Sequence, residues 1–276
     1  MKPLRVIVTR PERDASRWVL ALQQHGLQAE ALPLIDIAAL PDSGDLRQAW
    51  REIGGYAALM FVSANAVDCF FASNEAPALI ERAKAAINFV ANSASTGATS
   101  PRFMAPGPGT VAALRHAGVP AAQIDAPAAD AGQFDSEALW AVVSHLPWRG
   151  RRVLIVRGQS AGAGVATGTT GRDWLAQQLQ TAGAQVDVVA VYQRRAPVFT
   201  APQRQLLAAA AHDGSVWLFS SSEALAHLPP QDWSQARAVA THPRIAEAVR
   251  AAGWAVVAES RPALEDIVAS IESIQP

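Results

Sequence analysis

The sequence has a single cysteine, Cys69, so no disulfide can form within the chain. Lysine and tyrosine are almost as scarce, with two residues of each among 276, and the formal net charge is −1. A charge this close to zero gives no sign of non-specific binding to nucleic acid or to membranes. We interpret Cys69, which lies in the apolar stretch VDCFFA, as a structural thiol and not as a nucleophile.

Long apolar runs are also missing. No stretch approaches the roughly 20 apolar residues that cross a bilayer, and the run in MKPLRVIVTR is too short for the core of a signal peptide. We therefore expect a cytoplasmic protein without membrane spans. The six histidines show no metal-ligand spacing, which disfavours metal catalysis. Half of the residues are hydrophobic, enough for one large or two medium domains.

Short apolar runs of strand length alternate with helical patterns along the chain. This alternation predicts an α/β protein with parallel sheets and helices on both sheet faces. Residues 220–223, SSSE, are expected to open a helix after a buried strand. Two stretches rich in small residues, 92–101 and 158–171, are expected to be long loops.

Three motifs occur twice, in the same order. RVIVTR returns as RVLIVR, FVSANAV returns as FSSSEAL, and PGPGTVAALRHAG returns as THPRIAEAVRAAG. The shared order indicates a duplicated α/β unit. Two extended segments, near 29–37 and 184–195, are expected to cross between two similar domains. Such crossings predict a hinge, with a ligand bound in the cleft that they define.

Small, hydroxyl-bearing or cationic residues follow the predicted strands, where ligands of open α/β sheets bind. They also precede helices, whose free N–H groups and positive dipole ends favour anions. We therefore expect a large anionic ligand. The alternative for the hydroxyl residues is helix capping, and for the arginines a surface ion pair. The candidate binding residues are Arg10, Ser63, Asn65, Gly107, Thr110, Arg157, Gly158, Ser221, Ser222, Thr241 and Arg244.

An ordered set of motifs resembles the uroporphyrinogen-III synthase family over nearly the whole length. No single motif is specific, and the two long loops depart from the expected pattern. The set includes VTRP at 8–11, FVSANAV at 61–67, GPGT at 107–110, LIVRG at 154–158, VYQRR at 191–195, FSSSEAL at 219–225 and ATHPRIAEA at 240–248.

The resemblance implies two similar, doubly wound, flavodoxin-like parallel-sheet domains joined by a two-stranded linker. The first domain would combine residues 1–36 with 196–276, and the second would span 37–195. The implied enzyme is a monomeric cyclising lyase without cofactor or metal. Its substrate would be hydroxymethylbilane, a linear tetrapyrrole with eight carboxylates.

The same resemblance points to Tyr192 in VYQRR as the catalytic residue. A phenol is protonated at neutral pH and can act as a weak general acid on a leaving hydroxyl group. The alternative is a tyrosine that only packs between the domains.

Two other functions remain open from the sequence. Residues 107–112, GPGTVA, fit the G-x-G-x-x-A pattern of dinucleotide-binding oxidoreductases, although the second copy THPRIA has no glycine. A two-lobed binding protein or sensor for an anionic small molecule is the non-enzymatic alternative.

Overall fold

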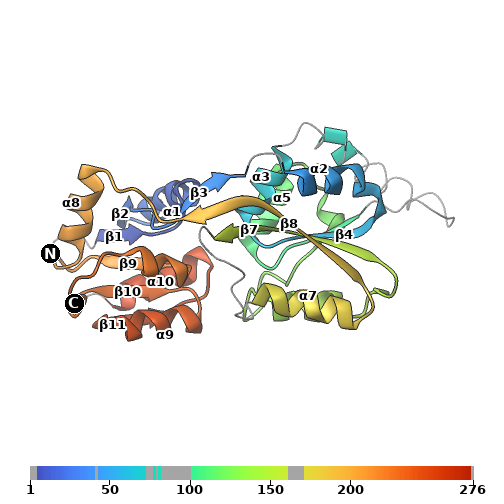
Figure 1. Ribbon diagram of the computed structural model, residues 1–276. Coiled ribbons are helices and arrows are strands. Elements are labelled where there is room, and N and C mark those ends of the chain that lie inside the picture. The colour runs from blue at the N-terminus through green and yellow to red at the C-terminus, as the bar shows by residue number, and fades with distance from the viewer. Residues whose placement is uncertain are drawn as a thin grey trace. The chain divides into compact units, whose positions relative to one another are not determined.

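The structure, a computed structural model, describes residues 5–40, 43–72, 77–78, 80–81, 101–160 and 171–274. The chain divides into two compact units (Figure 1). Unit 1 consists of residues 1–37 and 195–276, and unit 2 of residues 38–194. No helix among the described residues is both long enough and apolar enough to cross a membrane.

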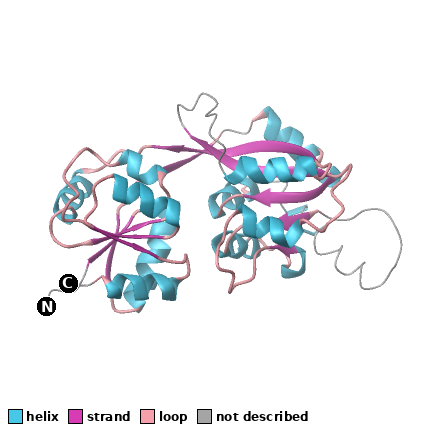
Figure 2. Ribbon diagram, turned by 90° about the horizontal axis from the view of Figure 1, so that it is seen from below, coloured by secondary structure: helices cyan, strands magenta, loops and turns pink. Residues whose placement is uncertain are grey.

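Unit 1 is a five-stranded sheet with helices on both faces, and its strands are seen nearly end-on in Figure 2. The strand order is β2-β1-β9-β10-β11, and every neighbouring pair is parallel. The strands are β1 (Arg5–Val8), β2 (Gln28–Ala31), β9 (Val216–Phe219), β10 (Arg237–Ala240) and β11 (Val256–Glu259). The helices are α1 (Glu12–Gln24), α8 (Ala201–Ala210), η3 (Glu223–His227), α9 (Pro243–Ala251) and α10 (Leu264–Ser273).

Alternate residues of each strand in unit 1 point into two separate cores. Val6 and Val8 pack with the apolar faces of α1 and α10, whereas Ile7 packs on the other side with α8 and α9. All three side chains are fully buried, and each contributes about 1.5–3 kcal/mol through burial of apolar surface. Burial on both faces explains why the central strands β1 and β9 carry continuous apolar runs without alternation.

Unit 2 is a six-stranded sheet in the order β3-β8-β7-β4-β5-β6. Its strands are β3 (Asp36–Ala39), β4 (Tyr56–Phe61), β5 (Arg102–Met104), β6 (Ile124–Asp125), β7 (Arg152–Ser160) and β8 (Gln185–Arg195). Its helical segments are α2 (Gly44–Arg51), η1 (Ile53–Gly55), α3 (Ala64–Phe71), α5 (Pro108–His116), η2 (Ala121–Gln123), α6 (Ser136–Val143) and α7 (Gly171–Thr181).

Unit 2 has a mainly aliphatic core and a separate aromatic cluster. The aliphatic core joins β4, β5 and β7 to the apolar faces of α6 and α7. In the aromatic cluster, Phe61 of β4 lies 5.4 Å from Phe70 of α3, and Phe70 stacks on Trp50 of α2 at 4.3 Å. Such ring pairs add about 0.5–1.5 kcal/mol beyond the burial of their area.

The two sheets have the same topology, and the two sequence copies are interleaved between them. The order β2-β1-β9-β10-β11 matches β8-β7-β4-β5-β6 strand for strand, which is the flavodoxin-like order. Unit 1 therefore combines β1 and β2 of the first sequence copy with β9, β10 and β11 of the second. Unit 2 combines β4, β5 and β6 of the first copy with β7 and β8 of the second. Gly118 and Gly253, matched in the repeat, end α5 and α9 with φ of 93° and 87°, which glycine adopts without steric cost. The predicted fold class, parallel α/β sheets with helices, is confirmed.

One prediction about local structure is wrong, and another is met only by a short helix. Residues 158–160 belong to β7 and not to a loop, because β8 continues far enough to pair Gly158 with Tyr192 and Ser160 with Arg194. The helix expected to open at 220–223 is the short 3₁₀ helix η3, and Pro229 and Pro230 prevent its continuation. The remainder of the expected loops, 92–100 and 161–170, lies outside the described residues.

Candidate active site

The candidate residues lie at the carboxyl ends of the strands and fall into two sets. Ser63, Asn65, Gly107, Thr110, Arg157, Gly158 and Tyr192 lie in unit 2, and Arg10, Ser221, Ser222, Thr241 and Arg244 lie in unit 1. Within each unit, the carboxyl ends of parallel strands meet at one edge of the sheet. Each set therefore occupies the edge where this fold presents its ligand-binding groups.

Tyr192 lies on β8 and is only 2% exposed. Its hydroxyl is 3.1 Å from Ser63 Oγ, and either group can be the donor. Ser63 follows β4, so this contact joins the carboxyl ends of two strands that are not neighbours in the sheet. The structure thus brings together two residues that the sequence separates by 129 positions.

Gly158 lies directly against Tyr192. The register of β7 and β8 shifts between Arg157 and Gly158, so Arg157 pairs with Ala190 and Gly158 with Tyr192. One residue of β8, Val191, is therefore extra, as in a β-bulge. A Cβ atom placed on Gly158 would lie 2.3 Å from Cε2 and Cζ of the Tyr192 ring. Only glycine leaves room for the ring at this point.

Ser63 and Gly107 occupy helix N-caps in unit 2. Ser63 Oγ accepts a hydrogen bond from Ala66 N–H at 3.2 Å, which confirms the capping interpretation for this residue. Gly107 is the N-cap of α5 without a side-chain cap, and the buried Thr110 lies in the first turn of the same helix. Asn65 is partly exposed in the first turn of α3. These two helix starts give the edge free backbone N–H donors.

Arg157 forms an ion pair within unit 2. Its Nη1 lies 3.3 Å from Asp173 Oδ1, with both side chains partly exposed. An exposed pair of this kind contributes little stability, in the range of about 0–1 kcal/mol. A substrate carboxylate can therefore compete with Asp173 for Arg157 at small cost.

Arg10 follows β1 in unit 1 and packs over an aromatic ring. Its guanidinium carbon lies 4.5 Å from the centroid of the Trp18 ring on α1. Its Nε is buried and has no hydrogen-bond partner among the described residues. Burial lowers the pKa of Arg10 to about 10, an effect that the nearby Asp14 opposes. The guanidinium is still charged at neutral pH and can attract a carboxylate.

The role of Trp18 was missed by sequence reasoning. Trp18 lies eight positions after Arg10, and nothing in the sequence signals that the two residues touch. The cation–π contact exists only when the end of β1 and helix α1 are folded against each other, so it cannot be recognised from the sequence alone.

The remaining unit 1 candidates cap helices or lie beside caps. Ser221 Oγ accepts from Glu223 N–H at 3.2 Å, and Ser222 is the N-cap of η3. The N–H of the buried Thr241 donates to Phe219 O at 3.0 Å, between β10 and β9. Arg244 has an exposed side chain at the start of α9, and its N–H donates to His242 Nδ1 at 3.1 Å. The bond from Glu223 N–H therefore accounts for the Ser221 hydroxyl, and the exposed Arg244 side chain has no ion pair among the described residues.

Comparison with known proteins identifies the family. The family model described as "Uroporphyrinogen-III synthase HemD" matches residues 16–269, which is more than nine-tenths of the chain. The chain belongs to the uroporphyrinogen-III synthase family. Enzymes of this family are cyclising lyases of haem biosynthesis and act on a tetrapyrrole.

Solved structures of uroporphyrinogen-III synthases have a similar fold. The enzyme from Helicobacter pylori is 14% identical with a TM-score of 0.58, over 99% of this chain and 100% of that one. A mutant of the enzyme from the extremely thermophilic bacterium Thermus thermophilus is 15% identical with a TM-score of 0.53, over 98% of both chains. At such low identity the likeness concerns the fold alone.

Membership of the uroporphyrinogen-III synthase family leaves the dinucleotide-binding alternative without support. Among the described residues, no protein contact requires a glycine at position 107 or 109. A Cβ on Gly107 would make an ordinary contact of 3.6 Å with Phe134, and one on Gly109 would meet nothing within 4 Å.

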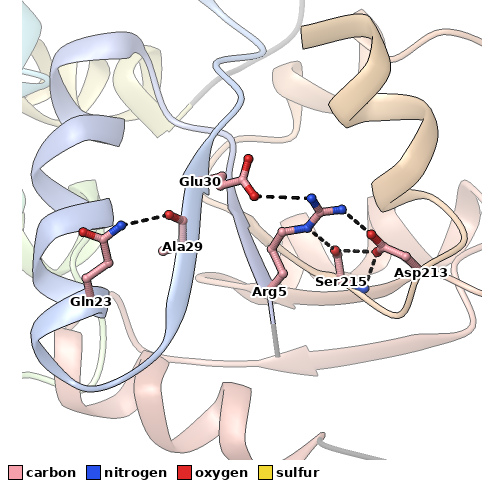
Figure 3. A network of polar contacts seen from close by, with 6 residues as sticks. All are labelled: Arg5, Gln23, Ala29, Glu30, Asp213 and Ser215. Carbon is pink, nitrogen blue, oxygen red and sulfur yellow. Dashed lines mark hydrogen bonds and ion pairs between the residues drawn. The ribbon is translucent and has the colours of Figure 1, made fainter. Parts of the chain in front are cut away.

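Each sheet also carries a polar network at its amino edge, away from the candidate residues. In unit 1, Arg5 contacts Glu30, Ser215 and Asp213, and the three partners surround its guanidinium (Figure 3). The distance from Arg5 Nη1 to Glu30 Oε1 is 3.3 Å, and Ser215 Oγ also donates to Asp213 at 2.6 Å. Nearby, Gln23 of α1 donates to Ala29 O at 3.2 Å. These contacts fix β1, β2 and β9 to one another.

In unit 2, Arg152 occupies the place that Arg5 has in unit 1. Its Nη2 donates to Asp187 at 2.6 Å and to Glu52 at 2.7 Å, and these bonds raise the pKa of Arg152. Tyr56 donates to Asp187 at 2.9 Å. Burial, then the hydrogen bond to Asp187, raises the pKa of Tyr56 to about 12. The matched arginines of RVIV and RVLIV were the sequence signal for both networks.

Proposed function

We propose that this chain converts hydroxymethylbilane into uroporphyrinogen III, with loss of water and inversion of ring D. One observation carries the assignment of the catalytic residue. The Tyr192 hydroxyl contacts Ser63 at the carboxyl edge of the unit 2 sheet, in a chain whose family acts on a tetrapyrrole. Tyr192 is the acid of the reaction, and other candidate residues of both units bind substrate.

The first step is departure of the ring A hydroxyl group. Tyr192 donates its proton to that oxygen, the C–O bond breaks, water leaves, and the carbon becomes a cation conjugated with the pyrrole. The substituted carbon of ring D attacks the cation and forms a spiro intermediate. Breakage and reclosure invert ring D, and the proton that the ring system releases returns to the phenolate oxygen. The overall change is loss of one water.

Selectivity comes from positioning and not from a strong catalytic group. Hydroxymethylbilane can close without an enzyme to the isomer that lacks the inversion, so the protein must hold the conformation in which the substituted carbon attacks. Precise placement of reacting atoms lowers a barrier by as much as ~7–11 kcal/mol. This is several times the difference needed to select one product.

The eight carboxylates of the substrate meet arginines and helix N-termini. Arg10 keeps its charge, Arg157 has a weak ion pair, and Arg244 is exposed. The starts of α3 and α5 add backbone N–H groups near Ser63 and Gly107. Asn65, Thr110, Ser221, Ser222 and Thr241 complete the set through hydroxyl, amide or backbone groups.

The proposal extends to assembly and location. We propose a monomeric, cytoplasmic enzyme that binds no nucleic acid and needs neither cofactor nor metal. The single cysteine suits a reducing compartment, and the net charge of −1 gives no general attraction to nucleic acid. Light scattering on the purified protein tests the monomer, with a mass of 29.1 kDa expected.

The experiment that tests the function is turnover of hydroxymethylbilane by the purified protein, followed by separation of the product isomers. Formation of the inverted isomer supports the proposal. A thermal shift with hydroxymethylbilane but no turnover would favour the binding-protein alternative.

A further inference from the structure

We infer that Ser63 and Gly158 are positioning residues, which together fix the place of the Tyr192 ring and the direction of its hydroxyl hydrogen. The inference rests on the proposed function, in which Tyr192 is the acid. It gives Gly158 and Ser63 roles that differ from direct contact with substrate.

Gly158 sets the place of the ring. The bulge at Arg157/Gly158 puts Tyr192 directly opposite Gly158, and the ring covers the position that a Cβ would take. A Cβ there would be 2.3 Å from Cε2 and Cζ and 2.8 Å from Cδ2. Real Cβ atoms do not approach other heavy atoms within 3.0 Å, and the phenol is a rigid plane. Any side chain at Gly158 must therefore displace Tyr192.

Ser63 sets the direction of the hydroxyl hydrogen. Its Oγ already accepts the Ala66 N–H at 3.2 Å, at the positive end of α3. The Ser63 hydroxyl hydrogen then points away from the helix, where the Tyr192 oxygen lies at 3.1 Å. In the inferred arrangement, Ser63 donates in this contact and Tyr192 accepts.

The direction of this bond leaves the Tyr192 hydrogen free for the substrate. The two hydrogen bonds then point in the same direction: Ala66 N–H donates to Ser63, and Ser63 donates to Tyr192. Each bond in such a chain strengthens the next. The last donor of the chain is the phenol, whose partner is the departing hydroxyl of the substrate. The helix cap at Ser63 thereby polarises the proposed acid.

The chain offers a direct probe of this geometry because it has only two tyrosines, Tyr56 and Tyr192. Protein labelled with 3-fluorotyrosine gives two ¹⁹F resonances, which the Tyr56→Phe and Tyr192→Phe variants assign. Gly158→Ala and Ser63→Ala should shift the Tyr192 resonance and leave that of Tyr56 in place. Gly109→Ala is the matched control, because a Cβ there meets nothing within 4 Å.

Turnover provides the second readout. Ser63→Ala should lower kcat about three- to tenfold, as expected for one lost hydrogen bond, with KM changed less than about twofold. Ser63→Thr, which keeps the hydroxyl group, should recover most of the loss. A role for Ser63 in substrate binding would instead raise KM, and that result would overturn its assignment as a positioning residue.

The outcomes separate this inference from the proposed function. An unmoved Tyr192 resonance in both Gly158→Ala and Ser63→Ala would overturn the positioning. If Gly158→Ala does not fold, the Ser63→Ala and Ser63→Thr pair decides the question alone. The Tyr192 resonance could instead shift in both variants while the wild-type protein fails to turn over hydroxymethylbilane. That result would support the positioning of Tyr192 by Ser63 and Gly158 and would reject the proposed function.

Discussion

Arg5 and Arg152 are equivalent residues of the two sheets. Arg5 begins β1 and pairs with Glu30, which lies opposite Ile7, and Arg152 begins β7 and pairs with Asp187, which lies opposite Leu154. In each case the acid is opposite the residue two positions after the arginine. Both copies of the duplicated unit have therefore kept the arginine and its acidic partner near the amino ends of the strands. The candidate residues lie at the opposite, carboxyl ends.

Arg152→Ala should destabilise the protein without changing the product. The substitution leaves Asp187 and Glu52 without their shared donor and removes the guanidinium that lies 4.5 Å from the Tyr56 ring. We expect a loss of about 1–2 kcal/mol in the free energy of unfolding, because the side chains are partly exposed. Urea unfolding measures it. Arg151→Ala, at the exposed neighbouring arginine, should change stability by less than about 0.5 kcal/mol, and equal losses in both variants would contradict the account.

Tyr56 should ionise well above an ordinary tyrosine. In the Tyr192→Phe variant it is the only tyrosine, so ultraviolet absorbance of the phenolate follows its ionisation alone. We expect a midpoint near pH 12 in the folded protein and near about pH 10 in urea. Because folding favours the protonated phenol, this group makes the folded state less stable as pH rises from about 10 towards 12. Asp187→Asn should lower the folded midpoint, and a midpoint near 10 before that change would contradict the hydrogen-bonded burial of Tyr56.

Tyr192→Phe should lower kcat by roughly tenfold or more and leave the fold intact, since it removes only the hydroxyl group that acts as acid. Single-turnover assays with hydroxymethylbilane measure the change. The chain provides its own control in Tyr56→Phe, the same substitution at the amino edge of the same unit, which should leave kcat unchanged. Equal rates for wild type and Tyr192→Phe would remove Tyr192 from the mechanism.

Arg10→Gln should weaken substrate binding more than it slows the chemistry. A charge-assisted hydrogen bond to a carboxylate contributes about 1.5–3 kcal/mol, so KM should rise roughly tenfold or more while kcat changes little. Arg10→Lys should recover only part of the loss, since an ammonium cannot stack on Trp18 as the planar guanidinium does. Arg17→Ala, at an exposed arginine of the following helix, serves as control. An unchanged KM in Arg10→Gln would assign Arg10 to packing alone.

Much of the fold could be predicted because its signals are local. Continuous apolar runs at β1, β4, β7 and β9 indicated buried parallel strands, and the repeated motifs indicated two related sheets. The interleaving of the copies was harder, since it depends on which strands pair across a long separation in sequence. The extent of β7 was misjudged for the same reason. Gly158 belongs to a strand only because β8 lies beside it.

The candidate site was predictable in its residue types but not in its contacts. Strand ends followed by Ser63, Thr241 or Arg10 could be read from the sequence, because helix starts need caps and anions need donors. The contact of Tyr192 with Ser63 and Gly158 could not, since it depends on a one-residue bulge. The sequence analysis placed Gly158 at the start of a long loop, whereas in the structure the Tyr192 ring requires a glycine at this position.

The isomer composition of the product tests the central claim most directly. Hydroxymethylbilane is incubated with increasing amounts of the purified protein, and the macrocycles are separated by chromatography after oxidation. We expect the share of the inverted isomer to rise with protein concentration until spontaneous closure is negligible, and Tyr192→Phe to need far more protein for the same share. A product that remains the non-inverted isomer at every concentration of active, folded protein would contradict the account.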